Sequence, residues 1–195
     1  MAIVINGSGT LSGLAVGGLP DGTVDSGTLA TDSVVAAKLG TDAVTADALK
    51  SDAIIDADLP AGSVLQVVQA TTSTKASTTS TGYSDTGLTA SITPSSSSNK
   101  VLVIISNSCY QADATGYLRL LRGNHYKDFG YPAGYNGLEE ITYVPIHYLD
   151  SPSTTSATTY KMQHKRTGGS GSFHSNYTDG GGTMPSYITL MEIAG

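Results

Sequence analysis

Residues 38–54 read KLGTDAVTADALKSDAI and are the clearest part of a repeat that organises the first third of the chain. Within this stretch, and on both sides of it, an aliphatic residue returns every five positions without a slip. From Leu19 onward, leucine alternates with a β-branched residue, so the repeat unit is a decapeptide. Self-similarity at a fixed period predicts a repetitive, elongated architecture. The full series is Leu14, Leu19, Val24, Leu29, Val34, Leu39, Val44, Leu49, Ile54, Leu59 and Val64.

A period of five fits neither a regular helix nor a regular strand. In an α-helix, five residues rotate the side chain by about 140°, so the series would spiral around the axis. In a strand, an odd spacing sends successive members of the series to opposite faces. Each pentad must therefore contain a bend, and the intervening Gly, Asp, Thr and Ser residues suit a bend.

Two architectures satisfy this geometry: a single chain that coils with a corner at every pentad, and several chains wound around a common axis. The first resembles the pentapeptide-repeat family, but it would bury the positions two before the central residues. Here those positions include Asp32, Asp42, Asp47 and Asp52, and burying unpaired carboxylates is costly. A flexible linker would not keep so regular an apolar register. We therefore predict a shaft of intertwined copies with a core of Leu19, Val24, Leu29, Val34, Leu39, Val44, Leu49, Ile54, Leu59 and Val64.

Composition divides the chain at the same place. Residues 1–65 contain eight aspartates, two lysines and no aromatic residue, and they carry the whole net charge of −6. Without large side chains they are a poor candidate for an independent globule. The negative charge disfavours a nucleic-acid partner, and no apolar run approaches the roughly 20 residues needed for membrane insertion. The first residues lack the pattern of a secretory signal, and the single Cys109 excludes an internal disulfide.

The remaining residues, 66–195, predict a β domain. Seven runs rich in β-branched or aromatic residues are separated by clusters of Gly, Ser, Thr, Pro or Asn. Their number predicts an antiparallel β-sandwich or jelly roll. The continuously apolar run 101–105 is typical of a central strand covered on both faces, and Pro145 indicates an edge strand or a bulge. The runs are residues 64–69, 88–93, 100–110, 117–122, 140–149, 158–165 and 186–194.

No motif in the sequence is typical of an enzyme, a metal site or a cofactor site. The four histidines show no HxxxH or HExxH spacing, and one cysteine cannot form a zinc knuckle. Glu139 and Glu140 are adjacent, so on a strand their carboxylates would point to opposite faces. Cys109 lies in an apolar strand pattern that favours a buried structural thiol. We therefore expect no enzymatic activity, no metal and no cofactor.

Two predicted loops have the composition of an adaptable contact surface. Residues 123–137 and 168–186 set aromatic rings among Gly, Ser and Asn, as antibody paratopes do. Sugars suit such surfaces, because their C–H faces stack on rings while polar side chains meet the hydroxyls. Alternatively, the rings fill the interface between copies or cap the domain. The candidate receptor-binding residues are His125, Tyr126, Asp128, Phe129, Tyr131, Tyr135, Asn136, Phe173, His174, Asn176 and Tyr177.

The run DSVVAAKLGTDAVTADALKSDAI (residues 32–54) and the opening MAIVINGSGTLSGLAVGGLPDGTV (residues 1–24) resemble the fibre proteins of tailed bacteriophages. The resemblance is strongest to fibres of phages that infect cyanobacteria and marine bacteria, and it covers roughly residues 1–65. A weaker resemblance links the rest of the chain to the β-rich tip domains of such fibres. It implies a homotrimer on an external virion appendage, anchored by its N-terminus and exposed at its C-terminus.

We therefore expect an attachment segment (1–18), a trimeric shaft (19–65) and a β-sandwich tip (66–195). Attachment would add a strand to a baseplate, tail or neck protein through Ile3, Val4 and Ile5. The tip would bind a glycan or an outer-membrane receptor on the host surface, and the protein would be made in the host cytoplasm. Two alternatives stay open: a purely structural head, neck or tail fibre, and a polysaccharide-degrading spike.

Overall fold

The computed structural model describes residues 4–5, 11–12, 34–35, 39, 58–129, 140–179 and 182–195. The chain divides into two compact units, Met1–Ala53 and Ile54–Gly195. In the first unit, β1 (Val4–Ile5) pairs antiparallel with β2 (Leu11–Ser12), and the side chains of Val34 and Leu39 are about half exposed. The other attachment and shaft positions lie outside the described residues, namely Ile3, Leu19, Val24, Leu29, Val44, Leu49 and Ile54.

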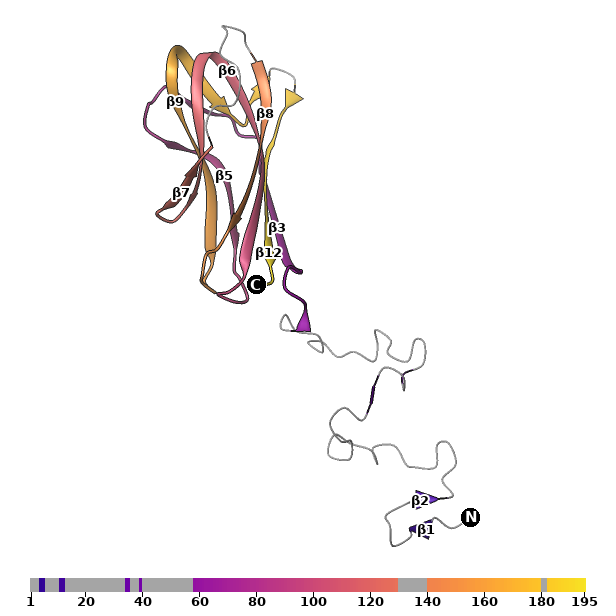
Figure 1. The fold of residues 1–195 in the computed structure, drawn as a ribbon. Coiled ribbons are helices and arrows are strands. Elements are labelled where there is room, and N and C mark those ends of the chain that lie inside the picture. Colours follow the sequence, from indigo (N-terminus) through magenta and orange to yellow (C-terminus); the bar gives the residue numbers. More distant parts are fainter. Residues whose placement is uncertain are drawn as a thin grey trace. The chain divides into compact units, whose positions relative to one another are not determined.

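The second unit is built around one eight-stranded antiparallel sheet (Figure 1). Its strands are β3 (Val64–Thr72), β4 (Ala76–Thr78), β5 (Ser84–Ile92), β6 (Lys100–Arg122), β7 (His125–Asp128), β8 (Glu140–Asp150), β9 (Thr158–Ser175) and β12 (Ser186–Ile193). The short strands β10 (Thr178–Asp179) and β11 (Gly182–Thr183) form a separate hairpin. The described residues contain no α-helix, so the prediction of a mainly β fold is confirmed.

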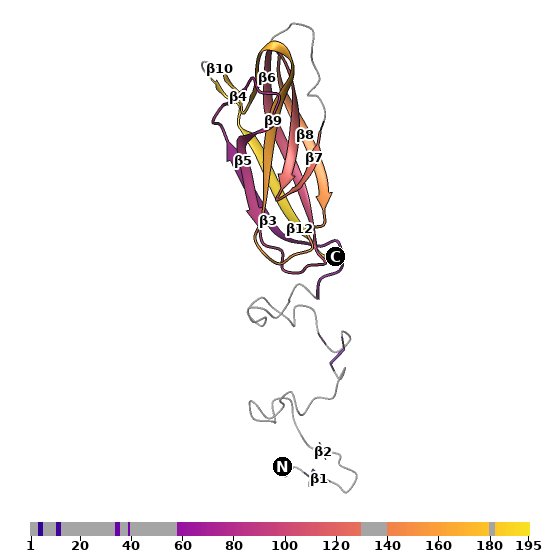
Figure 2. The same cartoon turned by 90° about the vertical axis from the view of Figure 1, so that its left-hand side faces the viewer.

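The two longest strands, β6 and β9, hold the sheet together and bend it. The first part of β6 pairs with β12 and β8, whereas its last part pairs with β9 and β7. Between these parts the register shifts twice, and Asp113 and Gly169 adopt positive φ angles of 48° and 79°. At this corner β6 and β9 curve over together (Figures 1 and 2). The strands form one folded sheet, not two separate sheets, because β6 runs through both halves and β9 stays paired with it around the corner.

We call β3, β12, β8 and residues 100–106 of β6 the first half-sheet. The second half-sheet comprises β5, β7, residues 158–165 of β9 and residues 116–122 of β6. Alternate side chains of both half-sheets point into one shared core, as the pleat of a strand requires. The core residues are Leu88, Ala90, Ile92, Val101, Val103, Ile105, Cys109, Ala114, Leu118, Leu120, Ile146, Tyr160, Met162, Phe173, Ile188 and Leu190.

Several local predictions can be compared with the strands. Cys109 is fully buried and burial raises the pKa of its thiol to about 12, which confirms a structural role. Among the described strands β8 pairs only with β6, so Pro145 lies on an edge strand, as predicted. Two expectations were wrong. The runs 100–110 and 117–122 are one strand, β6, and the first half of the predicted loop 168–186 continues β9, because each segment supplies the other's hydrogen bonds around the corner.

Candidate functional site

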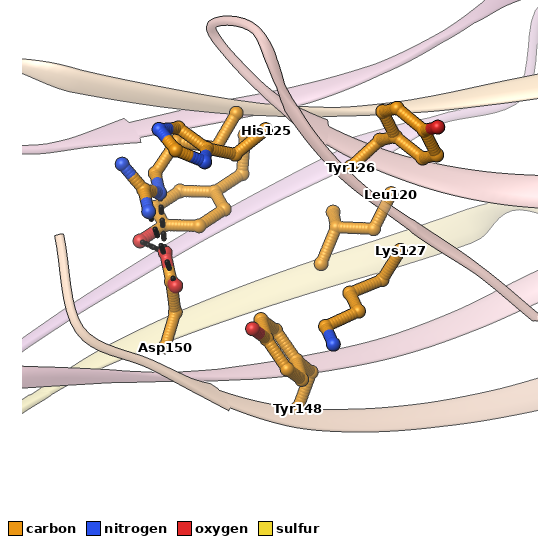
Figure 3. Close-up of a pocket in the computed structure, with 8 residues that line it drawn as sticks. Leu120, His125, Tyr126, Lys127, Tyr148 and Asp150 are labelled. Atoms are coloured by element: carbon orange, nitrogen blue, oxygen red, sulfur yellow. Dashed lines mark hydrogen bonds and ion pairs between the residues drawn. The ribbon is translucent and has the colours of Figure 1, made fainter.

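The candidate site is a pocket between β7 and β8 (Figure 3). Both strands pair with the same edge of β6, because β9 occupies the opposite edge at residues 109–111 and again at 119–122. Folding of the sheet at its corner leaves a space of about 240 Å³ between them. The lining residues are Leu120, Arg122, His125, Tyr126, Lys127, Tyr148, Asp150 and Tyr160.

One side of the pocket is formed by the hairpin that follows β6. A positive φ of 55° at Gly123 starts its two-residue turn, a conformation that glycine adopts without strain. The register pairs Arg122 with His125 and Leu120 with Lys127. Since directly opposed residues share a face, His125 and Lys127 point toward the pocket together with the core-facing Leu120.

The other side is formed by the end of β8, where Tyr148 and Asp150 share the inward face. Asp150 is buried and pairs with Arg122, whose Nε lies 2.5 Å from Oδ2 and whose Nη2 donates to Oδ1 at 3.3 Å. The Tyr160 hydroxyl donates to Asp150 Oδ2 at 2.7 Å. Burial and this hydrogen bond raise the pKa of Tyr160, so its hydroxyl stays protonated. Both oxygens of Asp150 are therefore already engaged.

Among the residues that line the pocket, the charged group that remains for a ligand is the Lys127 ammonium. The Lys127 ammonium lies 5.5 Å from the centre of the Tyr148 ring, and Figure 3 shows its side chain extending toward that ring. Within the described part of the chain, no carboxylate lies within ion-pair distance of Lys127. His125 is exposed on the same side of the pocket, and its ring nitrogen adds a second hydrogen-bond donor besides the Lys127 ammonium. The pocket thus combines an accessible aromatic face with unpaired hydrogen-bond donors.

Tyr126, on the rim, links the pocket to a ladder of rings and cations on the outer surface. The Arg119 guanidinium carbon lies 3.7 Å from the centre of the Tyr83 ring and 4.1 Å from that of Tyr126. The Lys165 ammonium lies 4.6 Å from the centre of the Tyr83 ring. Asp128 Oδ1 accepts hydrogen bonds from Arg119 Nε and the Tyr83 hydroxyl, each at 2.9 Å. These contacts hold the Tyr126 ring at the mouth of the pocket.

The hydrogen bonds of this ladder shift the titration of its members. Burial and the hydrogen bond to Asp128 raise the pKa of Tyr83 to about 12. For Asp128 burial favours the neutral form, but the hydrogen bonds from Arg119 and Tyr83 outweigh it and lower the pKa. Asp128, a candidate receptor residue, orients Arg119 against the rings, and its side chain is 47% exposed, so its contact with a receptor stays a prediction.

Three other predicted receptor residues are placed inside the domain. Phe173 is fully buried in the core, because the alternation of β9 sends it inward. Asn176 is also buried, and its Nδ2 donates to the carbonyls of Thr74 at 3.1 Å and Thr86 at 2.6 Å. Phe129 is partly buried and packs against the core. The prediction that Phe173 and Asn176 contact a receptor is wrong, since both side chains are fully buried, whereas a receptor contact of the partly buried Phe129 stays a prediction.

His174 and Tyr177 form a different group, away from the pocket residues. The Tyr177 ring stacks on Tyr110 with centroids 4.1 Å apart, and His174 lies 5.6 Å from Tyr110. His174 Nδ1 is 2.7 Å from Ser77 Oγ. Burial, together with the charge of Lys75, lowers the pKa of His174. These rings are partly exposed, but they are packed on one another rather than around a cavity.

The structure therefore brings together two predicted residues, His125 and Tyr126, and adds six that were not predicted for the site. The added residues are Leu120, Arg122, Lys127, Tyr148, Asp150 and Tyr160. Strand alternation could have placed Tyr148 and Asp150 on one face, but it could not show which strand they oppose. Tyr131, Tyr135 and Asn136 lie outside the described residues, in the segment that joins β7 to β8 in sequence.

Comparison with known protein families and with curated proteins finds no match to this chain. Searching the residues placed by the structure reveals no group of three or more His, Cys, Asp or Glu side chains that could hold a metal ion. None of the described segments forms a helix long and apolar enough to cross a membrane.

Proposed function

We propose that this chain is a bacteriophage fibre protein that forms a homotrimer on the outside of the virion. Residues 1–18 would attach it to a tail, neck or baseplate protein, residues 19–65 would form the shaft, and residues 66–195 would form a jelly-roll-like β-sandwich tip. The decapeptide repeat supports this proposal. So does the exposure of the described shaft residues in the single chain, since aliphatic groups at this spacing need partner copies to cover them. Those residues are Val34, Leu39, Leu59 and Val64.

We propose further that the tip binds a glycan of the host surface, and the pocket between β7 and β8 is the observation that carries this assignment. Its volume of about 240 Å³ is below that of most drug-sized ligand sites and suits a single sugar unit. The Tyr148 and Tyr126 rings offer faces for the C–H groups of a sugar ring. Rigid aromatic walls with a few polar groups are the usual composition of a small-ligand site.

The polar groups of the pocket favour an acidic sugar over a neutral one. Because Asp150 is occupied by Arg122 and Tyr160, it contributes little to binding sugar hydroxyls. Lys127 and His125 are donors, and Lys127 has no carboxylate partner among the described residues. A carboxylate or phosphate on the sugar would meet Lys127 in a charge-assisted hydrogen bond, which is stronger than a neutral one.

Binding can be tested with acidic oligosaccharides that contain uronic acid, compared with their carboxyl-reduced counterparts. Lys127→Gln should weaken binding of the acidic form by about tenfold or more, since it removes one charge-assisted hydrogen bond. Lys100→Gln makes the same charge change outside the pocket and should leave binding unchanged. Equal binding of acidic and reduced oligosaccharides, or equal loss in both variants, would contradict the assignment.

The role in the virion needs a separate experiment, because a purely structural fibre would share the same shaft and tip. Phage that carry Lys127→Gln together with Tyr148→Ala should adsorb to host cells more slowly than the wild type. Unchanged adsorption with normally assembled fibres would favour the structural role. New reducing ends after incubation of the protein with host polysaccharide would instead point to an enzyme.

A further inference from the structure

The outer surface of the first half-sheet carries a continuous row of apolar side chains. The register places Val67 of β3 opposite Met191 of β12, Met191 opposite Leu102 of β6, and Leu102 opposite Leu149 of β8. Directly opposed residues lie on the same face, so the row crosses all four strands. Its two ends are the most open, with Val67 57% and Leu149 51% exposed.

The surroundings of this row are almost free of charge. The outward positions of β3, β12, residues 100–106 of β6 and residues 143–149 of β8 include Lys100 and His147, but no carboxylate. Ile104 and Ile193 also point outward there, and Tyr187 is 40% exposed. An apolar surface of this width on a lone chain is typical of a surface that another molecule covers.

The sequence of β6 also indicates that another molecule covers this surface. The run 101–105 is continuously apolar, a pattern typical of a strand covered on both faces. In the single chain only one face is covered: Val101, Val103 and Ile105 are at most 1% exposed, whereas Leu102 and Ile104 are partly exposed. The second cover is therefore missing from the isolated chain.

We infer that copies of this chain pack against one another through the outer surface of the first half-sheet, which we call the apolar face. The inference rests on the proposed trimer and names the surface of the tip that forms it. The apolar face also continues the exposed aliphatic series, because Leu59 and Val64 precede Val67 along the chain and are 38% and 52% exposed. A shaft of three intertwined copies would bring the apolar faces of the three tips close to one another.

Charge favours a second copy over a charged partner. The net charge of −6 lies on residues 1–65 and residues 66–195 balance to zero, so copies of the tip repel each other only where carboxylates meet at their contacting surfaces. The apolar face is free of carboxylates. The outer surface of the second half-sheet is not, because it carries Asp85 and Asp128 in exposed ion pairs with Lys161 and Arg119.

Thiol labelling of the full chain tests this surface directly. Leu149→Cys places a thiol on the apolar face, and Ser91→Cys places one at an exposed position on β5 of the second half-sheet. The native Cys109 will not interfere, because it is fully buried and its thiol pKa is raised to about 12. In the purified protein at neutral pH, we expect a maleimide to label the Leu149→Cys thiol at least tenfold more slowly than the Ser91→Cys thiol.

Light scattering of the same samples separates this inference from the proposed trimer. Oligomeric wild-type protein with a protected Leu149→Cys thiol supports both. If the protein is oligomeric and both thiols react equally fast, copies do not pack through the apolar face, and the proposed trimer is unaffected. A monomer overturns packing between copies, whether or not the thiol is protected. As a second variant, Val67→Lys with Leu149→Lys should lower the native mass or restore labelling of Tyr187→Cys, and Ser91→Lys should do neither.

Discussion

The outer surfaces of the two half-sheets differ although the same strand, β6, runs through both. On the first half-sheet its outward residues include Leu102 and Ile104, set among other apolar side chains. On the second they include Tyr117 and Arg119, set among rings, cations and carboxylates. Both surfaces obey the same alternation, so the pattern of the strand does not distinguish them.

The two surfaces differ in whether their side chains are stable in contact with water. On the second half-sheet every charge in the ion pairs is matched nearby and remains hydrated, so this surface is stable as a solvent-facing one. On the first, the exposed row from Val67 to Leu149 gains only by leaving water. The outer surface of the second half-sheet is therefore stable in the single chain, whereas we propose that the apolar face is covered by another copy.

The largest effect is expected at the corner that creates the two surfaces. A Cβ at Gly169 would overlap the Asp113 carbonyl oxygen, and the φ of 79° disfavours any L side chain there. We expect Gly169→Ala to lower the free energy of unfolding by at least about 3 kcal/mol, measured by urea denaturation. Gly182→Ala, where a Cβ meets no atom within 4 Å, should change it by less than about 0.5 kcal/mol. Similar effects of the two substitutions would contradict the proposal that the bend of the sheet requires glycine at position 169.

The core shared by both half-sheets should lose stability in acid. His164 is buried, its Nδ1 lies 3.0 Å from Ser175 Oγ, and burial together with the charge of His174 lowers its pKa to about 4. The unfolded chain, with a histidine pKa near 6.5, therefore binds a proton at a higher pH than the folded chain does. Stability from this group is complete above pH 6.5 and is lost as the pH falls toward 4, by about 2 kcal/mol at pH 5.

The control for this pH dependence is His164→Gln, which cannot take up the proton. Its free energy of unfolding should fall less between pH 8 and pH 5 than that of the wild type. The other three histidines are present in both proteins, so the comparison isolates His164. Parallel curves for the two proteins would show that His164 is not buried in its neutral form.

The ladder on the second half-sheet should contribute a moderate amount. Arg119→Gln removes the ion pair with Asp128 and the stacking on Tyr83 and Tyr126 together. We expect a loss of about 1 kcal/mol in the free energy of unfolding, because both kinds of contact are partly exposed. The loss should shrink in 1 M salt, which screens the ion pair. A loss above about 3 kcal/mol would mean that the ladder is buried, and that this surface too is covered.

The smallest effect is expected for the isolated ion pair on the same surface. Lys161 Nζ lies 2.8 Å from Asp85 Oδ2, and the side chains are 37% and 52% exposed. Lys161→Gln should therefore change the free energy of unfolding by less than about 0.5 kcal/mol by urea denaturation. A larger effect than that of Arg119→Gln would reverse the order proposed for this surface.

Much of the strand content could be predicted from local patterns. Alternating or continuous apolar runs identified β3, β5, β8 and β12, because period two directly reports a half-buried strand. The same patterns failed at residues 111–116 and 168–175, where Gly, Ser and Ala interrupt the hydrophobic signal. Those segments are strands because each pairs with the other around the corner, an interaction between residues more than 50 positions apart.

The candidate site was predictable only on one side. The ring-rich composition of residues 123–137 pointed to His125 and Tyr126, which line the pocket. It equally pointed to Phe129, which packs against the core, because composition does not say which way a side chain faces. The opposite wall, with Tyr148 and Asp150, required the register of β8 on β6.

By itself the sequence determined the β class of residues 66–195, the burial of Cys109 and a five-residue aliphatic period in the first third of the chain, and it narrowed Pro145 to an edge strand or a bulge. These properties follow from local spacing, which the pleat and the turn residues translate into structure. Only the tertiary structure decided that a single sheet folds at Asp113 and Gly169, that β7 and β8 enclose a pocket, and that one outer face is apolar. Such features depend on which distant strands pair, and that choice is set by packing of the whole core rather than by any one segment.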